Sequence, residues 1–295
     1  MKFGIALLAT FCLTGVVRAD DLDDHFAALK EAQPKKDPDE IKKLAVQTAK
    51  DAKAEAAKTQ PTGASEVDPW KKRVEFAKEV QAFAEYSLST TALTAPPAKT
   101  IELVDTLIEI NPKSTYLNEC AYTYLQALTK EGKKPADGAQ KILSGAPNNE
   151  DALFTLATSS MNGTYATRLV NVLKSKAKPE GMADADWERK KSLYLGQGYY
   201  VAGAAACTKS TWTDCDKNLR AALPYVSKEP SVAGPTYFYL GLANYNLAKL
   251  TADRAKLQEA EKFSEQSAAI AGPMQQQAAR NVAAMKQDLA GAGRR

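Results

Sequence analysis

The chain has 295 residues, of which 44% are hydrophobic and 25% are charged. This composition lies within the range of globular proteins and excludes a chain that is disordered throughout. Lysine and arginine number 39 against 35 aspartates and glutamates, and the resulting net charge of +4 is too small to predict nucleic-acid binding.

Residues 1–19 have the pattern of a cleaved signal peptide. Lys2 precedes an apolar stretch from Phe3 to Val17. The segment Val17-Arg18-Ala19 that follows is small enough around the expected cleavage site for a signal peptidase. The alternative, a membrane anchor, is disfavoured because an apolar stretch of about 15 residues is shorter than a spanning helix requires. We therefore expect a periplasmic or secreted protein whose mature chain begins at Asp20 and contains no transmembrane segment.

The next segment, residues 20–67, is rich in Ala, Lys, Asp and Glu and has few large apolar side chains. We therefore expect it to pack weakly. Within it, Asp37 followed by Pro38 has the pattern of a helix start, with an Asx cap and proline in the first turn, and predicts a helix over 41–58. Pro61 and Gly63 then indicate a linker over 60–67.

From Asp68 onward, helix signals recur with short interruptions. Apolar residues repeat with a 3.6-residue period, and Pro, Gly and Asx residues separate the periodic stretches. We expect a long helix opened at Asp68, a helix over 101–110 and a helix capped by Ser114 and closed at Gly132. Further helices are predicted over 135–144, 152–161, 164–176, 184–206, 211–225 with a capping box at Thr211, 235–250, 253–270 and 273–289. No stretch alternates as a half-buried strand does, so the predicted fold class is all-α.

Two of these segments look like copies of each other. The runs 193–219 and 238–264 align without a gap and share these pairs: Tyr194/Tyr239, Leu195/Leu240, Gly196/Gly241, Tyr200/Tyr245 and Lys217/Lys262. An internal helical repeat of this period is typical of a solenoid, which offers a long surface rather than a reaction pocket.

The predicted first helices also follow, loosely, a pattern of an aromatic residue, a Leu-Gly or Leu-Ala pair and a second aromatic residue, and the last two of them contain the Leu-Gly pair itself. These residues are Leu117, Cys120, Ala121 and Tyr124; Leu153, Leu156, Ala157 and Ser160; Ser192, Leu195, Gly196 and Tyr199; and Tyr237, Leu240, Gly241 and Asn244. The pattern resembles the tetratricopeptide repeat, and over 68–272 it implies a right-handed solenoid of four or five helical hairpins, with 273–295 as a capping helix and flexible tail. The small residue of each pair is expected to let the second helix of the hairpin approach closely. The chain is similar to exported bacterial members of this family.

The resemblance implies a binding groove lined by the first helices. The corresponding positions are Asn118, Tyr122, Leu125, Gln126, Phe154, Thr158, Met161, Leu193, Gln197, Tyr200, Phe238, Leu242 and Tyr245. Such an aromatic-rich groove suits a protein or peptide partner, because aromatic side chains offer contact area and amides can bond an extended backbone. The alternative is that several of these aromatics pack against neighbouring hairpins or against the long helix that contains Trp70.

Catalytic motifs are missing from the sequence. There is no G-x-S-x-G, H-E-x-x-H or P-loop, and His25, the single histidine, lies in a polar leader with no partner histidine or cysteine nearby. We therefore predict a non-catalytic adaptor with no cofactor, no metal site and no nucleic-acid partner. The alternatives are a fixed structural subunit of an envelope complex, or an enzyme whose site is assembled from distant helices.

Three cysteines follow the leader: Cys120, Cys207 and Cys215. Cys207 and Cys215 flank a predicted turn, and an exported protein meets an oxidising environment, so a disulfide is one interpretation. Two separately buried small residues are the other.

Overall fold

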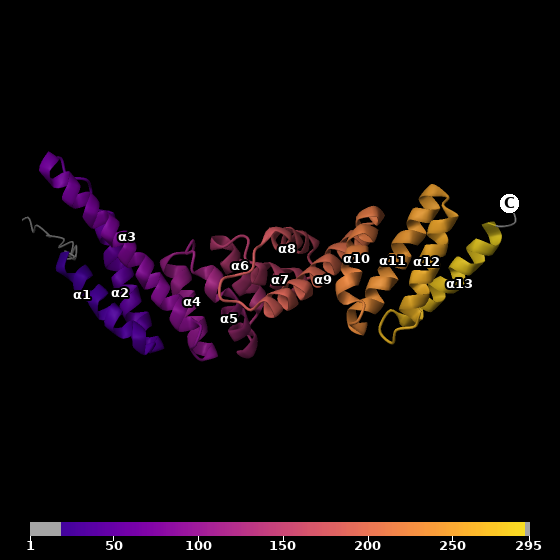
Figure 1. Ribbon diagram of the computed structural model, residues 1–295, viewed down its shortest axis with the longest axis horizontal. Coiled ribbons are helices and arrows are strands. Elements are labelled where there is room, and N and C mark those ends of the chain that lie inside the picture. The colour runs from indigo at the N-terminus through magenta and orange to yellow at the C-terminus, as the bar shows by residue number, and fades with distance from the viewer. Residues whose placement is uncertain (1–18, 293–295) are drawn as a thin grey trace, which may run out of the picture. The chain divides into compact units, whose positions relative to one another are not determined.

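The computed structural model describes residues 19–292, and within that range every regular element is a helix and none is a strand (Figure 1). The all-α prediction is therefore confirmed for this part of the chain. The expected signal peptide falls almost entirely on residues outside the described range. Within residues 19–292, no helix has the combined length and apolarity that crossing a bilayer requires.

The chain divides into two compact units, with the boundary between Tyr116 and Leu117. Unit 1 holds α1 (Ala19–Ala32), a short 3₁₀ turn η1 (Gln33–Lys35), α2 (Pro38–Ala56), α3 (Ala64–Ala92) and α4 (Pro97–Ile110). The repeat segment expected over 68–272 is thus divided, since α3 packs against α2 and α4 in unit 1.

The expectation that residues 20–67 pack weakly is wrong. Leu22 and Leu29 of α1 and Ile41 of α2 are fully buried, together with an alanine stripe on α2. Phe26 of α1 packs edge-on against the ring of Phe76 in α3, at 5.8 Å between ring centroids. Small apolar residues suffice here because they allow helices to approach closely, which a count of large side chains does not detect.

Helix starts in unit 1 are partly as expected. Asp37 caps α2 by accepting a hydrogen bond from the Glu40 backbone N–H. The linker over 60–67 is shorter than predicted, because α3 begins at Ala64 and contains Pro69 in its second turn. His25 is half-buried, and its Nδ1 lies 2.6 Å from the buried Oδ2 of Asp51.

Unit 2 consists of nine helices in the described residues. They are α5 (Leu117–Lys130), α6 (Pro135–Gly145), α7 (Glu150–Ser159), α8 (Gly163–Ser175), α9 (Asp184–Thr208), α10 (Trp212–Val226), α11 (Pro230–Thr251), α12 (Arg254–Ala268) and α13 (Gln275–Ala292). All the helices expected in this region are present, with boundaries shifted by a few residues.

Two of the predicted helix caps, Ser114 and Thr211, do not form the expected capping hydrogen bonds. Ser114 is buried and caps no helix, since α5 begins three residues later at Leu117. Thr211 makes no capping-box bond, because its hydroxyl donates to the Ala206 carbonyl of the preceding helix. Gly132 does close α5, with φ of +67°.

Contacts between helices alternate along unit 2. Each helix packs against the next one in sequence, and the odd-numbered helices also contact one another in the order α5, α7, α9, α11, α13. The even-numbered helices α6, α8, α10 and α12 make at most sparse contacts with each other. One set of helices therefore forms a continuous row within this unit.

Glycines bring the paired helices together, as the sequence predicted. A Cβ added at Gly196 of α9 would lie 2.8 Å from Tyr225 Cβ on α10. One added at Gly241 of α11 would lie 2.4 Å from Ser264 Oγ and 3.2 Å from the Ala260 carbonyl oxygen on α12. Since packed carbon atoms rarely approach so closely, these positions exclude larger residues.

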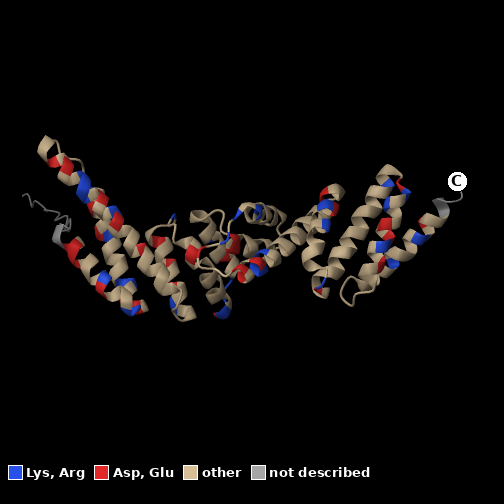
Figure 2. Ribbon diagram, viewed as in Figure 1, with Lys and Arg blue, Asp and Glu red and all other residues tan. Residues whose placement is uncertain are grey.

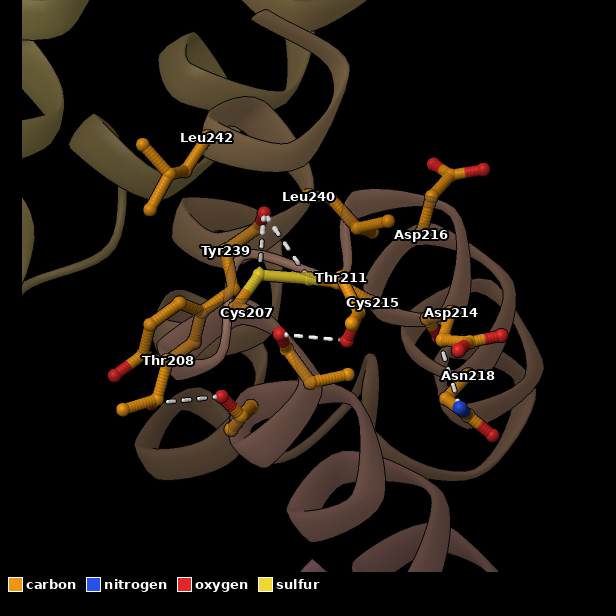
Figure 3. Close-up of a disulfide and its surroundings, with 12 residues drawn as sticks. Cys207, Thr208, Thr211, Asp214, Cys215, Asp216, Asn218, Tyr239, Leu240 and Leu242 are labelled. Atoms are coloured by element: carbon orange, nitrogen blue, oxygen red, sulfur yellow. Dashed lines mark hydrogen bonds between the residues drawn. A yellow bond between two sulfur atoms is a disulfide. The ribbon is translucent and has the colours of Figure 1, made fainter. Parts of the chain in front are cut away.

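Cys207 and Cys215 form a disulfide that joins the end of α9 to α10, which decides between the two sequence interpretations (Figure 3). Their Cα atoms are 5.0 Å apart, and both side chains are buried against Leu219 and Leu240. The sulfur atoms lie 3.6 and 3.9 Å from the Tyr239 carbonyl oxygen of α11. Cys120 is buried, and its Sγ lies 3.9 Å from the Leu117 carbonyl oxygen.

Removing this disulfide should destabilise the protein. For the double variant Cys207→Ala with Cys215→Ala, we expect the free energy of unfolding to fall by about 2–3 kcal/mol, because an eight-residue separation closes a short loop in the unfolded chain. Urea denaturation would measure the change. Wild-type protein in dithiothreitol should lose a similar amount, and equal stability with and without the reductant would contradict the prediction.

Candidate binding surface on the odd-numbered helices

The residues predicted to line a groove all lie on or next to the odd-numbered helices. On each helix they are spaced by three or four residues, except for the adjacent Leu125 and Gln126 of α5, so most of them share one side of their helix. We refer to the surface that they define on α5, α7, α9 and α11 as the odd-helix face.

The exposure of these residues varies. Exposed are Asn118, Tyr122, Gln126, Met161 and Leu193; half-buried are Phe154, Thr158, Gln197, Tyr200, Phe238, Leu242 and Tyr245; Leu125 is buried. Tyr122 is 53% exposed and Leu193 55%, which leaves both apolar side chains accessible to a ligand.

Met161 is not on a helix, contrary to expectation. The preceding helix α7 ends at Ser159, and Met161 occupies the turn that follows, with φ of +49°. Its side chain is 44% exposed. The turn is closed by Asn162, whose side chain accepts hydrogen bonds from the first two residues after Gly163 and so starts α8.

A charged cluster lies beside Tyr122 at the start of α7. It consists of Glu150, Asp151, Lys176, Lys190 and Tyr194. The two carboxylate side chains are buried, with 4% and 7% of their surface exposed. They occupy the first turn of α7, where the helix dipole favours negative charge.

Hydrogen bonds connect the members of the charged cluster. Lys190 Nζ lies 2.9 Å from Asp151 Oδ1 and 3.3 Å from Glu150 Oε1. The Tyr194 hydroxyl donates to Asp151 Oδ1 at 2.6 Å. Lys176, just past the end of α8, donates to Glu150. The cluster thereby ties α7, α8 and α9 together.

The pKa shifts in this cluster follow from burial and ion pairing. Burial by itself would raise the pKa of Glu150, but Lys176 and Lys190 outweigh it and lower that pKa. Burial would likewise lower the pKa of Lys190, yet Asp151 and Glu150 raise it. Burial and the Asp151 carboxylate both raise the pKa of Tyr194. At neutral pH Glu150 and Lys190 are therefore ionised and the Tyr194 phenol is neutral.

Aromatic rings extend the charged cluster onto the odd-helix face. Phe154 of α7 stacks on the Tyr194 ring of α9, with centroids 4.1 Å apart. The Lys190 ammonium lies 5.8 Å from the centroid of the Tyr122 ring on α5. Near the start of α5, Asn118 contacts the side chain of Asn149, the residue that caps α7. The structure thus brings residues from three predicted first helices into contact.

A cavity of about 700 Å³ opens next to this aromatic group. It is lined by four of the predicted groove residues, Leu125, Gln126, Phe154 and Thr158, and by parts of α6, α7 and α8 including Tyr165. Apolar walls with a few hydroxyl and amide groups are typical of ligand pockets.

Two of the predicted groove residues, Tyr200 of α9 and Tyr245 of α11, interact with neighbouring helices. Tyr200 packs with Tyr239 in the core around the disulfide, and burial together with Tyr239 raises its pKa. The Tyr245 hydroxyl donates to Asp288 of α13 at 2.9 Å, and Lys249 lies over its ring. For these positions, the alternative of packing against neighbouring helices describes the structure better.

A second polar network lies farther along unit 2 and also joins three helices. Arg220 of α10 forms ion pairs with Asp216 and with Glu259 of α12, each at 2.8 Å, and these interactions raise its pKa. It also contacts Asn244 of α11. The network is partly exposed, so we expect it to fix helix positions with a small contribution to stability.

The charged cluster could not be anticipated from local sequence. Glu150 and Asp151 look like ordinary first-turn acids, and Lys190 belongs to a run of charged residues typical of a solvated helix face. Figure 2 shows acidic and basic residues interspersed along most helices. The charges of this cluster differ from the others because their partners, such as Lys190 and Tyr194 for Asp151, lie about 40 positions away in the sequence.

Within residues 19–292, no group of three or more His, Cys, Asp or Glu side chains is arranged to hold a metal ion. In comparisons with known proteins, no family model, no curated protein and no solved structure matches the chain.

Proposed function

We propose that this chain is a non-catalytic, exported scaffold with tetratricopeptide-like stacking of helix pairs, and that it binds a protein or peptide partner on the odd-helix face of unit 2. The observation that carries this proposal is the exposed pair Tyr122 and Leu193. Lys190 contacts the Tyr122 ring and lies three residues before Leu193 on the same side of α9. The two exposed side chains therefore lie on either side of Lys190, which is held by its ion pairs with Asp151 and Glu150.

Preorganisation is the physical reason why this surface suits a ligand. The charged cluster fixes Phe154, Tyr194 and Tyr122 before any partner arrives, so little side-chain entropy is lost on binding. The adjacent cavity gives an anchoring side chain of the partner a place to insert. The row of contacts between odd-numbered helices supports the solenoid part of the proposal.

The charged cluster favours a binding role over the enzyme alternative. A general base or nucleophile needs access to a substrate, whereas Asp151 and Glu150 are buried and already bonded to two lysines and a tyrosine. The disulfide supports export, because disulfides persist in oxidising compartments.

Peptide selection would test the binding surface. A random peptide library displayed on phage would be selected on the purified protein, and Kd values of the selected peptides measured by fluorescence anisotropy. We expect Tyr122→Ala with Leu193→Ala to weaken binding about tenfold, because each side chain offers a large exposed apolar contact.

A matched control would be Tyr86→Ala with Leu250→Ala, which removes the same two side-chain types at exposed positions outside the odd-helix face. Its Kd values should stay within about twofold of wild type. Selected peptides that bind the Tyr122/Leu193 variant as tightly as wild type would contradict the assignment. If no peptide is selected, the fixed structural subunit becomes the better interpretation.

A further inference from the structure

A second concave surface lies between α8 and α10, over α9, and it is separate from the odd-helix face. It is a groove of about 1020 Å³. Both α8 and α10 pack against α9 but make at most sparse contact with each other, which leaves the space between them open.

The groove is hollow because its floor consists of small side chains. Ala202, Ala205 and Ala206 of α9 line it, and the large residues of this stretch that reach it are Tyr199 of α9 and Lys209, which follows the end of the helix. Its walls carry hydroxyl and amide groups from Thr164, Thr167, Asn171 and Ser175 on one side and from Thr211 and Asn218 on the other.

Positive charge is concentrated in this groove. Four cations line it, Arg168, Lys174, Lys209 and Lys217, against one carboxylate, Asp214. The whole chain has nearly balanced charges, with 39 basic and 35 acidic residues, so the excess here is local. Among the ion pairs of residues 19–292, none involves any of these four cations.

Their other interactions leave the charge available. Arg168 contacts the neutral side chain of Asn148 at 3.3 Å, and Lys174 lies 5.5 Å from the centroid of the Tyr199 ring. The side chains of all four cations belong to exposed residues. We call this surface the basic groove.

We propose that the basic groove binds an acidic, extended segment of a partner protein. The cations supply charge complementarity to carboxylates spaced along such a segment. The amide and hydroxyl groups of the walls can donate to and accept from a peptide backbone, and the alanine floor contacts its small side chains.

Aromatic chemistry favours a peptide over a single-stranded nucleic acid. Nucleic acids of that kind stack their bases on exposed rings. The one aromatic residue of the basic groove, Tyr199, has Lys174 over its ring and Tyr225 stacked at 6.4 Å, so it offers no open platform.

Fluorescence anisotropy with defined probes would test this proposal. The probe is a labelled peptide of alternating Glu and Ser, compared with the same peptide carrying Lys in place of Glu and with a labelled oligothymidylate. We expect the acidic peptide to bind at low salt and to lose affinity as salt is added. The variant Lys209→Glu with Lys217→Glu should weaken its binding at least about tenfold.

Two further variants distinguish binding in the basic groove from a general effect of net charge on peptide affinity. Lys130→Glu with Lys133→Glu makes the same change in net charge at exposed positions outside the basic groove, and should alter Kd by less than about twofold. Asn171→Trp fills the groove without changing charge and should also weaken binding. The proposal is overturned by equal losses in both charge-reversal variants, by unchanged binding of Asn171→Trp, or by tighter binding of the oligothymidylate. All substituted residues are exposed, so circular dichroism should show unchanged helicity.

Discussion

Replacing Lys190 with methionine should lower the free energy of unfolding by about 3 kcal/mol, the range expected when one partner of a buried ion pair is removed. Methionine retains most of the apolar stem of the side chain, so the loss comes from the ammonium group. Without it, Asp151 keeps a single side-chain partner among residues 19–292, the Tyr194 hydroxyl, and Glu150 keeps Lys176. Urea denaturation with an unchanged m-value would measure the effect.

The adjacent lysine provides a matched control. Lys191 lies 5.7 Å from the Trp187 ring centroid and belongs to no ion pair of the described residues. Lys191→Met should therefore cost less than about 1 kcal/mol. Adding Asp151→Asn to Lys190→Met should recover part of the lost stability, since the buried negative charge is then gone. If Lys190→Met costs no more than Lys191→Met, the charged cluster does not hold α7 and α9 together as inferred.

Replacing Gly241 with alanine should destabilise the protein by about 2 kcal/mol, within the usual range for overpacking a core. In most helix interiors this substitution has the opposite sign, because alanine is intrinsically better than glycine by about 1 kcal/mol. Here the new methyl group would meet Ser264 Oγ at 2.4 Å and backbone atoms of α12 at 3.2 and 3.3 Å. A serine hydroxyl can rotate away, but the backbone atoms move only if α12 shifts.

Gly234, near the start of the same helix, is the control for this substitution. The nearest atom to a Cβ added there is Ile270 Cγ2 at 3.3 Å, in a half-buried side chain beyond the end of α12, and no backbone atom lies as close. Gly234→Ala should leave the free energy of unfolding within about 1 kcal/mol of wild type. Stabilisation by Gly241→Ala would show that α11 and α12 are not packed as closely as described.

The odd-helix face could be predicted in part. Spacing along each first helix placed Tyr122, Phe154 and Leu193 on one side of their helices, because that depends only on helical periodicity. The same rule also selected Leu125 and Tyr245, which neighbouring residues bury or engage. Periodicity identifies a side of a helix, and it does not identify what covers that side.

The sequence by itself determined the helices and their close pairing. Asp37, Gly132 and Asp253 start or stop helices through bonds to their own neighbours, and Gly241 limits side-chain size at one point of contact. These are local properties that a residue carries in any environment.

Only the tertiary structure decided which charges are buried, which cysteines are bonded and where the two units divide. Lys190 meets Asp151 across 39 positions, and Cys207 meets Cys215 because α9 and α10 turn back on each other. The burial of Leu22 and Leu29 likewise depends on α2 and α3. Burial and ion pairing are properties of several segments at once, so no single stretch of sequence contains them.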